Sequence, residues 1–273
     1  MERLIKRSSK STAIWLMVVL MSSWSVTLFA QNKKLFDHKV YINEAGDSLR
    51  YRLLLPKGYK SSKEYPLVLF LHGAGERGSD NEKQLSHGSS LFLDKHNRKE
   101  FPAIVVFPQC PEDTYWIDIS IRAELRGQGD PDFSQSLDQP SEQLDMVNEL
   151  VDQLQQDFSV DANRLYVMGL SMGGFGTLET LGRWPDKYAA AVAICGGGNI
   201  SLAKEYAPNT SVWLTHGGKD DVVPPILSRR VYEALLEENA DVRYDLYPEA
   251  NHNAWDPTFA EPELLPWLFS KHK

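Results

Sequence analysis

Ser171 stands in a setting that can turn a hydroxyl group into a nucleophile. It lies in Gly169-Leu-Ser171-Met-Gly173, between an apolar run over 164–169 and a segment with helical periodicity. In a sharp strand-to-helix turn of this Gly-x-Ser-x-Gly type, the serine backbone is strained, and the flanking glycines leave room for it. The hydroxyl then stands clear of the sheet at a helix N-terminus, where the helix dipole favours a developing negative charge. The motif predicts that Ser171 attacks a carbonyl carbon.

A serine nucleophile requires a base, which is usually a histidine oriented by an acid. Where this turn is used, the acid and then the histidine follow the serine along the chain. Three histidines follow Ser171, namely His216, His252 and His272. His272 lies in the terminal Lys-His-Lys, where fraying is expected, and His216 opens a turn where a structural role is expected. His252, after the last strand-like run, is therefore the predicted base.

The acid should lie between the serine and the histidine. Asp220 and Asp221 stand together there, directly after the strand-like run 212–216. Only one of them should reach the imidazole, and the other is then a solvated loop carboxylate or a turn former. The remaining aspartates of this part of the chain sit in helical or strand patterns with no comparable reason to converge. Both Asp220 and Asp221 remain candidates from the residues alone.

Acyl transfer also needs two backbone N–H groups that stabilise the oxyanion. One is expected from Met172, directly after the nucleophile, and the other from the loop that follows the third strand. That loop is Leu71-His-Gly-Ala-Gly-Glu-Arg-Gly78, whose glycines let the backbone approach the site closely. Ala74 is the predicted second donor.

Other kinds of site find little support in the sequence. No cluster of histidine, cysteine or carboxylate residues has metal-ligand spacing, and no glycine-rich loop of the dinucleotide type is present. We therefore expect neither a metal nor a cofactor. The formal net charge of −8 gives no electrostatic footprint for nucleic acid.

The chain that must position these groups alternates apolar runs with helical periods, which predicts an α/β sheet with crossover helices. From residue 67 onward the runs lack strict alternation, as is typical of strands covered by helices on both faces. Helices are expected over 141–158, with Ser141 as the N-cap, and over 225–239 and 257–270. The segment 117–139 is long for a connection and is either a functional loop, a small insertion or a surface excursion. The strand-like runs are 39–42, 49–55, 66–72, 103–107, 164–169, 189–195, 212–216 and 242–247.

The first 30 residues differ in charge and hydropathy from the remainder of the 273-residue chain. They carry four basic residues and one acidic residue, a net charge of +3, whereas the other 243 carry 25 basic and 36 acidic residues, a net charge of −11. The basic start leads into an apolar stretch over 13–30 that ends in Ala30, as in a secretory signal. An uncleaved membrane anchor is the alternative, since the stretch is near the lower limit of a membrane span. We expect a signal peptide over 1–30, one domain over 31–273, and a secreted or periplasmic protein with no stable membrane partner.

Together these residues resemble the α/β-hydrolase superfamily, and in particular its secreted esterase branch, which contains feruloyl and acetylxylan esterases, polyhydroxybutyrate depolymerases and phospholipase/carboxylesterase-like enzymes. The resemblance covers about 49–270 and implies an eight-stranded, mostly parallel sheet with helices on both faces. Its His-Gly-x-x-Asp-x-x-Val-Pro pattern places the acid at Asp220. The motifs that carry the resemblance are His72-Gly-Ala-Gly-Glu-Arg-Gly-Ser-Asp80, Pro108-Gln-Cys-Pro111, the serine turn up to Thr177, Ile194-Cys-Gly-Gly-Gly198, His216-Gly-x-x-Asp220-x-x-Val-Pro224 and Asn251-His252.

In a sheet of this order, two other strands separate those that end at Cys110 and Cys195, so free thiols are favoured over a disulfide. Glu76, Trp116 and Trp255 are candidate substrate-binding residues, although each aromatic residue could equally belong to the core or the surface.

The resemblance implies a serine esterase that cleaves small acyl or aryl esters or the ester groups of plant polysaccharides, with activity that falls between about pH 7 and 5 as the histidine is protonated. A peptidase of the prolyl-oligopeptidase type is an alternative, but it normally carries a large propeller, for which the 243 residues after the leader leave no room. A polysaccharide-binding relative without catalysis is the other alternative, and the complete set of serine, acid and histidine argues against it.

Overall fold

The computed structural model describes residues 33–117, 133 and 141–273. The expected signal peptide and most of the segment 117–139 lie outside the described residues. Phe36–Lys273 form one compact unit. In the described part of the chain, no helix has the length and apolarity needed to cross a membrane.

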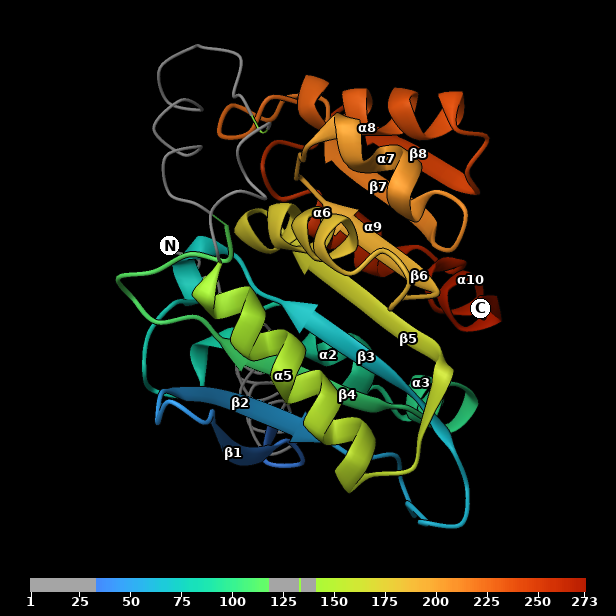
Figure 1. Cartoon of the computed structure of the whole chain (residues 1–273). Coiled ribbons are helices and arrows are strands. Elements are labelled where there is room, and N and C mark those ends of the chain that lie inside the picture. Colours follow the sequence, from blue (N-terminus) through green and yellow to red (C-terminus); the bar gives the residue numbers. More distant parts are fainter. Residues whose placement is uncertain (1–32, 118–132, 134–140) are drawn as a thin grey trace, which may run out of the picture. The chain divides into compact units, whose positions relative to one another are not determined.

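The unit is built on one eight-stranded sheet, in the order β1-β2-β4-β3-β5-β6-β7-β8 (Figure 1). The pairs β1–β2 and β2–β4 are antiparallel, and all the other neighbours are parallel. The predicted mostly parallel sheet is confirmed. The strands are β1 (Asp37–Ile42), β2 (Ser48–Leu54), β3 (Tyr65–Leu71), β4 (Ile104–Gln109), β5 (Val160–Leu170), β6 (Ala190–Ile194), β7 (Ser211–Gly217) and β8 (Val242–Tyr247).

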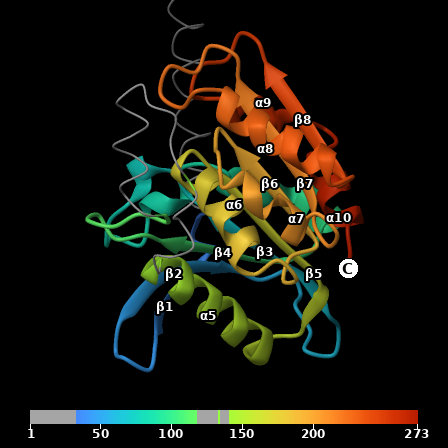
Figure 2. The same ribbon diagram turned by 45° about the horizontal axis from the view of Figure 1, so that its top comes forward.

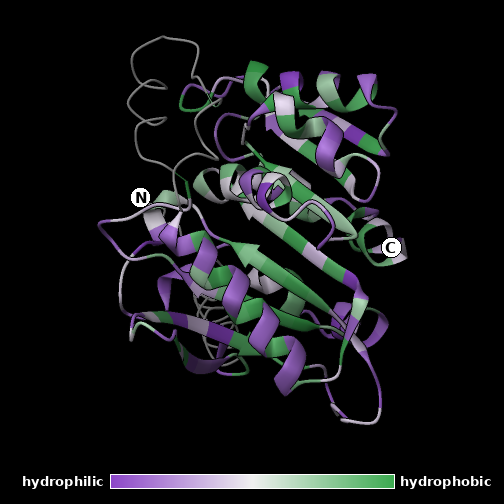
Figure 3. Cartoon of the chain, in the orientation of Figure 1, coloured by the Kyte–Doolittle hydropathy of each residue, from purple (hydrophilic) through white to green (hydrophobic). Residues whose placement is uncertain are grey.

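Side chains of the central strands are buried on both faces of the sheet. In β3, Leu67, Leu69 and Leu71 belong to one apolar cluster together with α5 (Glu142–Asp157) and α8 (Ile226–Glu237). Val68 and Phe70, which alternate with them, belong to a second cluster together with α2 (Ser89–Leu93) and α10 (Leu264–Ser270). Strands buried on both faces read as continuous apolar runs, as Figure 3 shows for β3.

The helices divide between the two faces as these clusters require. Figures 1 and 2 show α5, α6, α7 and α8 on one side of the sheet, and α2 and α3 on the other. The predicted Ser141 cap of α5 is present, since its Oγ accepts a hydrogen bond from the Leu144 N–H at 3.4 Å. The other elements not yet bounded are α3 (Lys95–Glu100), α6 (Met172–Arg183), α7 (Ala203–Tyr206), α9 (Trp255–Ala260) and the 3₁₀ turns Ala74–Glu76, Lys83–Leu85 and Ile200–Leu202.

The single helix expected over 257–270 is wrong, because two helices, α9 and α10, occupy this stretch. The break falls at Glu261, which has an extended conformation with φ −65° and ψ 120°. Pro262 follows it in the sequence. A proline disfavours the helical conformation of the residue before it, so the helix ends there.

The register of the parallel strands brings four loops to the same edge of the sheet. Leu71 at the end of β3 lies opposite Gly169 of β5, and Gly217 at the end of β7 lies opposite Tyr247 of β8. The loops that carry Ala74, Ser171, Asp220 and His252 all leave from these carboxyl ends. Ligands of open α/β sheets bind at this edge.

Candidate active site

Ser171 forms the turn between β5 and α6 and has a strained backbone, with φ 52° and ψ −119°. Its N–H donates a hydrogen bond to the Ile194 carbonyl oxygen at 2.8 Å, which ties the turn to β6. The two glycines of the motif allow this conformation. A Cβ on Gly169 would lie 2.1 Å from the Gly173 oxygen, and one on Gly173 would lie 1.9 Å from the Leu71 oxygen. The turn therefore packs directly against the end of β3.

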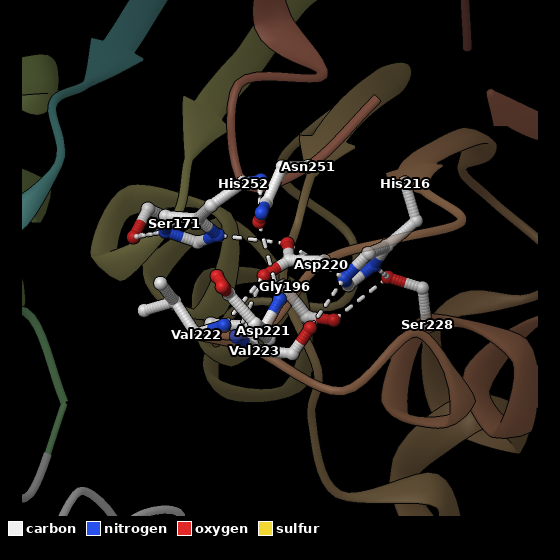
Figure 4. A network of polar contacts seen from close by, with 10 residues as sticks. All are labelled: Ser171, Gly196, His216, Asp220, Asp221, Val222, Val223, Ser228, Asn251 and His252. Carbon is white, nitrogen blue, oxygen red and sulfur yellow. Dashed lines mark hydrogen bonds and ion pairs between the residues drawn. The ribbon is translucent and has the colours of Figure 1, made fainter. Parts of the chain in front are cut away.

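His252 and Asp220 complete a hydrogen-bonded chain with the serine, which Figure 4 shows. The Oγ of Ser171 lies 2.8 Å from Nε2 of His252, and Nδ1 of His252 lies 2.7 Å from Oδ2 of Asp220. The side chain of Asp220 is fully buried, whereas that of His252 is 18% exposed. The structure thus brings together the three residues that the sequence singled out.

The Asp220 carboxylate is bound on both oxygens, which decides between the two neighbouring aspartates. Its Oδ1 accepts hydrogen bonds from the N–H groups of Val222 and Val223, at 3.0 and 2.8 Å. Burial raises the pKa of Asp220, but the hydrogen bonds from His216, His252 and Val223 outweigh it and hold the pKa well below its usual value. Asp220 is therefore ionised. Asp221 is exposed, and its contact with the site runs from its backbone N–H to Asn251.

Asn251 fastens the histidine loop to the acid loop. Its Oδ1 accepts hydrogen bonds from the Asp221 N–H at 3.2 Å and from the His252 N–H at 2.7 Å. This contact was not predicted as a functional one, although Asn251 precedes the predicted base in the sequence. It joins residues 30 positions apart, so only the fold could reveal it.

Both predicted oxyanion donors begin a helical turn. Met172 is the first residue of α6, and Ala74 is the first residue of the 3₁₀ turn Ala74–Glu76. The first N–H groups of a helix have no acceptor within the helix, so these two amides are available to a ligand. The close contact between Gly173 and Leu71 brings the two turns together.

His72 holds the loop that carries Ala74. The ring is fully buried, its Nε2 accepts a hydrogen bond from the Cys110 N–H at 3.0 Å, and its Nδ1 lies 2.7 Å from the Gly73 oxygen. An acceptor at Nε2 places the proton on Nδ1, which donates to Gly73. Burial lowers the pKa of His72 to about 4. The ring is therefore neutral at ordinary pH and serves the loop as one acceptor and one donor.

Trp116, a candidate substrate-binding residue, has the core position that the sequence left open as its alternative. Its side chain is fully buried, and its indole N–H donates to the His72 oxygen at 3.0 Å. The side chain also lies against Gly176 of α6, where an added Cβ would come within 2.8 Å of the Trp116 Cβ and 3.2 Å of the indole Cγ. Trp116 therefore packs between the loop after β3 and α6.

Gln109 belongs to the Pro108-Gln-Cys-Pro111 motif, but the sequence assigned it no role, and in the structure it also holds this loop. Its Nε2 donates to the Glu76 oxygen at 3.2 Å and to Asp80 Oδ1 at 2.9 Å, while its Oε1 accepts from the Asn81 N–H at 2.6 Å. The amide group thus connects the end of β4 to both halves of the loop that carries Ala74.

Trp255 and Glu76 belong to one row of contacts that starts at His252. The Trp255 ring meets His252 edge-on, with centroids 5.5 Å apart, and its centroid lies 5.3 Å from that of His87. His87 Nε2 is in turn 3.7 Å from the Glu76 carboxylate. His87 was not predicted from the sequence, because no motif connects it to the serine turn.

The two cysteines are free and buried, as favoured from the sequence. Burial raises the pKa of each thiol to about 12, so neither competes with Ser171 as a nucleophile. Cys195, His216 and Asp220 bring three potential ligand atoms within 4.8 Å of one another. Both ring nitrogens of His216 and the Asp220 carboxylate already have protein partners, so this cluster is a hydrogen-bonded core rather than a metal centre.

A strained serine on a strand-to-helix turn, with a histidine and an aspartate from later loops of the same sheet, defines the α/β-hydrolase class. The comparison with protein families agrees with this geometry. The chain belongs to the phospholipase/carboxylesterase family, whose model matches residues 59–261.

The relatives include several esterases. The chain is 24% identical over 212 residues to acyl-protein thioesterase 1 of Debaryomyces hansenii, a match that covers 71% of this chain and 87% of the relative. It is 25% identical over 174 residues to a probable feruloyl esterase C of Aspergillus terreus, a match that covers 64% of this chain and 56% of the relative. The crystal structure of a thermostable esterase superposes with a TM-score of 0.79 at 32% identity, covering 89% of this chain and 64% of that one. Three other curated relatives are matched over only 11%, 42% and 12% of their lengths.

Proposed function

We propose that this protein is a serine carboxylic-ester hydrolase that works through an acyl-enzyme. The observation that carries the proposal is the chain of two short hydrogen bonds, 2.8 Å from Ser171 to His252 and 2.7 Å from His252 to Asp220. Membership of the phospholipase/carboxylesterase family supports the same reaction.

In the first step, Nε2 of His252 takes the hydroxyl proton of Ser171 while Oγ forms a bond to the ester carbonyl carbon. The carbonyl electron pair moves to oxygen, and the N–H groups of Met172 and Ala74 stabilise the oxyanion. Asp220 accepts the Nδ1 hydrogen bond, which keeps the reactive tautomer and stabilises the imidazolium.

In the second step, the tetrahedral intermediate collapses and the bond to the leaving alcohol breaks. The His252 imidazolium gives its Nε2 proton to the alcohol oxygen, which leaves Ser171 acylated. Water then attacks the acyl-enzyme, giving a proton to His252. The collapse of this second intermediate releases the carboxylic acid and returns the proton to Ser171.

We propose small acyl or aryl esters, or ester groups on plant polysaccharides, as the substrates. The feruloyl esterase among the relatives supports this class. Trp255 and His87 supply aromatic surface beside the base. We place the acyl group against an apolar cluster that includes Phe175, one helical turn beyond the nucleophile. It consists of Phe175, Val223 and Leu227, with Ile117 and Phe133 packed against them. Export by the leader over 1–30 is part of the same proposal, since such polymers are met outside the cell.

The mutation Ser171→Ala tests the reaction. Hydrolysis of p-nitrophenyl acetate should fall at least a hundredfold, because the attacking oxygen is lost, while the circular dichroism spectrum stays unchanged. Ser90→Ala, at an exposed serine of α2, is the control and should keep full activity. More than about a hundredth of the activity in Ser171→Ala would contradict the proposal. Wild type that is not labelled by a fluorophosphonate would instead favour a non-catalytic binding protein.

A thioester hydrolase is the second candidate, because the match to acyl-protein thioesterase 1 covers 87% of that protein. A panel of aryl acetates, methyl ferulate, acetylated xylan, tributyrin, polyhydroxybutyrate, an acyl thioester and an N-acyl peptide separates the candidates. The ester proposal predicts the highest kcat/KM on methyl ferulate, an aryl acetate or acetylated xylan. A higher value on the thioester or on the peptide would overturn the assignment of the substrate class.

A further inference from the structure

The Asp220 carboxylate faces two histidines at the same oxygen atom. Nδ1 of His252 lies 2.7 Å from Oδ2, and Nε2 of His216 lies 3.3 Å from the same atom. The triad mechanism uses only the first of these contacts. The side chains of both His216 and Asp220 are fully buried, so no water separates or screens them. Figure 4 shows the two rings on opposite sides of the carboxylate.

The surroundings of His216 settle the position of one proton. Its Nε2 faces Asp220 Oδ2 and, at 3.0 Å, the Val223 carbonyl oxygen. Both atoms are acceptors, so Nε2 must carry a hydrogen and donate it. A buried nitrogen lone pair facing two oxygens would lose its hydrogen bond and be repelled by both. His216 is thus a hydrogen-bond donor to the predicted catalytic carboxylate.

The opposite side of the ring is fixed by α8. Nδ1 of His216 lies 2.7 Å from the Ser228 Oγ, and that hydroxyl donates to the Gly196 oxygen at 2.7 Å. Ser228 is itself fully buried. The ring is therefore held at Nδ1 by Ser228 of α8 and at Nε2 by the acid loop. It cannot turn away without breaking the contacts of both nitrogens.

Among the residues that the structure describes, few titratable groups face this ring. Asp220 does so from the acid loop and Cys195 from the end of β6, while His252 lies beyond the carboxylate. Lys219, the nearest cation along the chain, is exposed and pairs with Glu249. The environment of the carboxylate is therefore set by the two histidines, the amides of Val222 and Val223, and one protonated thiol.

We propose that His216 is a positioning residue, which holds Oδ2 of Asp220 in line with His252 and shares the negative charge of that oxygen with it. The proposal rests on the triad reaction proposed above. His216 does not touch the substrate. It acts through Asp220, by fixing where the carboxylate lies and how strongly it attracts the His252 imidazolium.

Removing the donor should change the triad in two ways. In His216→Leu, the carboxylate loses one support, and kcat should fall about tenfold with little change in KM, because substrate binding does not involve this ring. The charge on Oδ2 would then be directed at His252 alone. His252 should hold its proton more firmly, so the acid limb of the kcat/KM profile should move to higher pH.

Three variants and a spectrum test this proposal. His216→Gln can still donate an N–H to Oδ2 and should return the acid limb towards its wild-type position. Ser228→Ala removes the anchor of the ring and should move the limb in the same direction as His216→Leu, but less. Thr215→Val is the matched control, because Thr215 is the buried neighbour of His216 in β7 and its hydroxyl accepts a hydrogen bond from the Thr258 hydroxyl rather than contacting the triad. This control should keep the acid limb of wild type, whatever its effect on stability.

Proton NMR gives a reading that does not depend on activity. The proton between His252 Nδ1 and Asp220 should resonate further downfield in His216→Leu than in wild type, since the shared oxygen is freed. Unchanged limb and unchanged resonance in His216→Leu would overturn the proposal. If His216→Leu does not fold, Ser228→Ala takes its place in the test. An unchanged acid limb in Ser228→Ala would then overturn the proposal. Absence of any wild-type ester hydrolysis would instead contradict the proposed function, while leaving the resonance shift to test His216.

Discussion

His72 and His216 are both fully buried at the carboxyl ends of parallel strands, β3 and β7, yet their partners make opposite demands. His72 receives a hydrogen bond from the Cys110 N–H and gives one to the Gly73 oxygen. His216 meets two acceptors, Asp220 and the Val223 oxygen, with a single nitrogen. The first ring therefore works as a neutral bridge between two loops, and the second as a donor to a charge.

This difference shows that histidine serves two parts of the site in different ways. The oxyanion half is the loop that carries Ala74, and the acid half is the loop that carries Asp220. In the oxyanion half, the neutral side chains of His72, Gln109 and Trp116 hold the loop by hydrogen bonds to backbone oxygens. The acid half contains a buried carboxylate, which needs several donors to stay ionised away from water. The contrast predicts that mutations in the two halves lower activity and stability to different extents.

The largest effect is expected in the acid half. Asp220→Asn should lower kcat about 10⁴-fold, because the amide cannot hold the reactive tautomer of His252 or stabilise its imidazolium. Asp221→Asn is the matched control and should stay within twofold of wild type, since its side chain is exposed. Steady-state hydrolysis of p-nitrophenyl acetate measures both variants. A greater loss in Asp221→Asn than in Asp220→Asn would reverse the assignment of the acid.

A smaller effect on activity, with a larger cost in stability, is expected in the oxyanion half. His72→Leu leaves the Cys110 N–H and the Gly73 oxygen without their partner, which should lower the free energy of unfolding by about 2–4 kcal/mol. The loop that carries Ala74 loses support, so kcat should fall about 10- to 100-fold. Urea denaturation and kinetics measure these quantities. His96→Leu, at an exposed histidine, is the control, and equal losses in both variants would remove the distinction.

The smallest effect concerns how stability depends on pH. The pKa of His72 is lowered to about 4 in the folded protein, so the unfolded chain binds this proton at a higher pH than the folded one. The contribution of His72 is therefore present above about pH 6.5 and is lost as the pH falls to about 4, by up to about 3 kcal/mol. Urea denaturation at successive pH values should show a steeper fall for wild type than for His72→Gln. Parallel stability curves for the two proteins would mean that folding does not lower the pKa of His72.

Much of the site could be predicted from the sequence because it is encoded locally. The Gly-x-Ser-x-Gly turn specifies its own strain and spacing, and the order of serine, acid and histidine follows from which strands end at the site. The choice of Asp220 over Asp221 needed the family pattern, and the structure provides its physical reason in the amides of Val222 and Val223. The burial of Trp116 and the contacts of Asn251 and Gln109 join distant parts of the chain, so no local pattern reveals them.

The sequence by itself determined the chemistry that is available: a serine in a turn that strains it, a histidine and an aspartate in the right order, and strands apolar enough to be buried on both faces. Each of these depends on neighbours within a few residues, which a linear reading can detect. The tertiary structure alone decided how that chemistry is held. His72 reaches Cys110 across 38 positions and Ser228 reaches Gly196 across 32, because the sheet order, and not the chain order, sets which buried groups must satisfy one another.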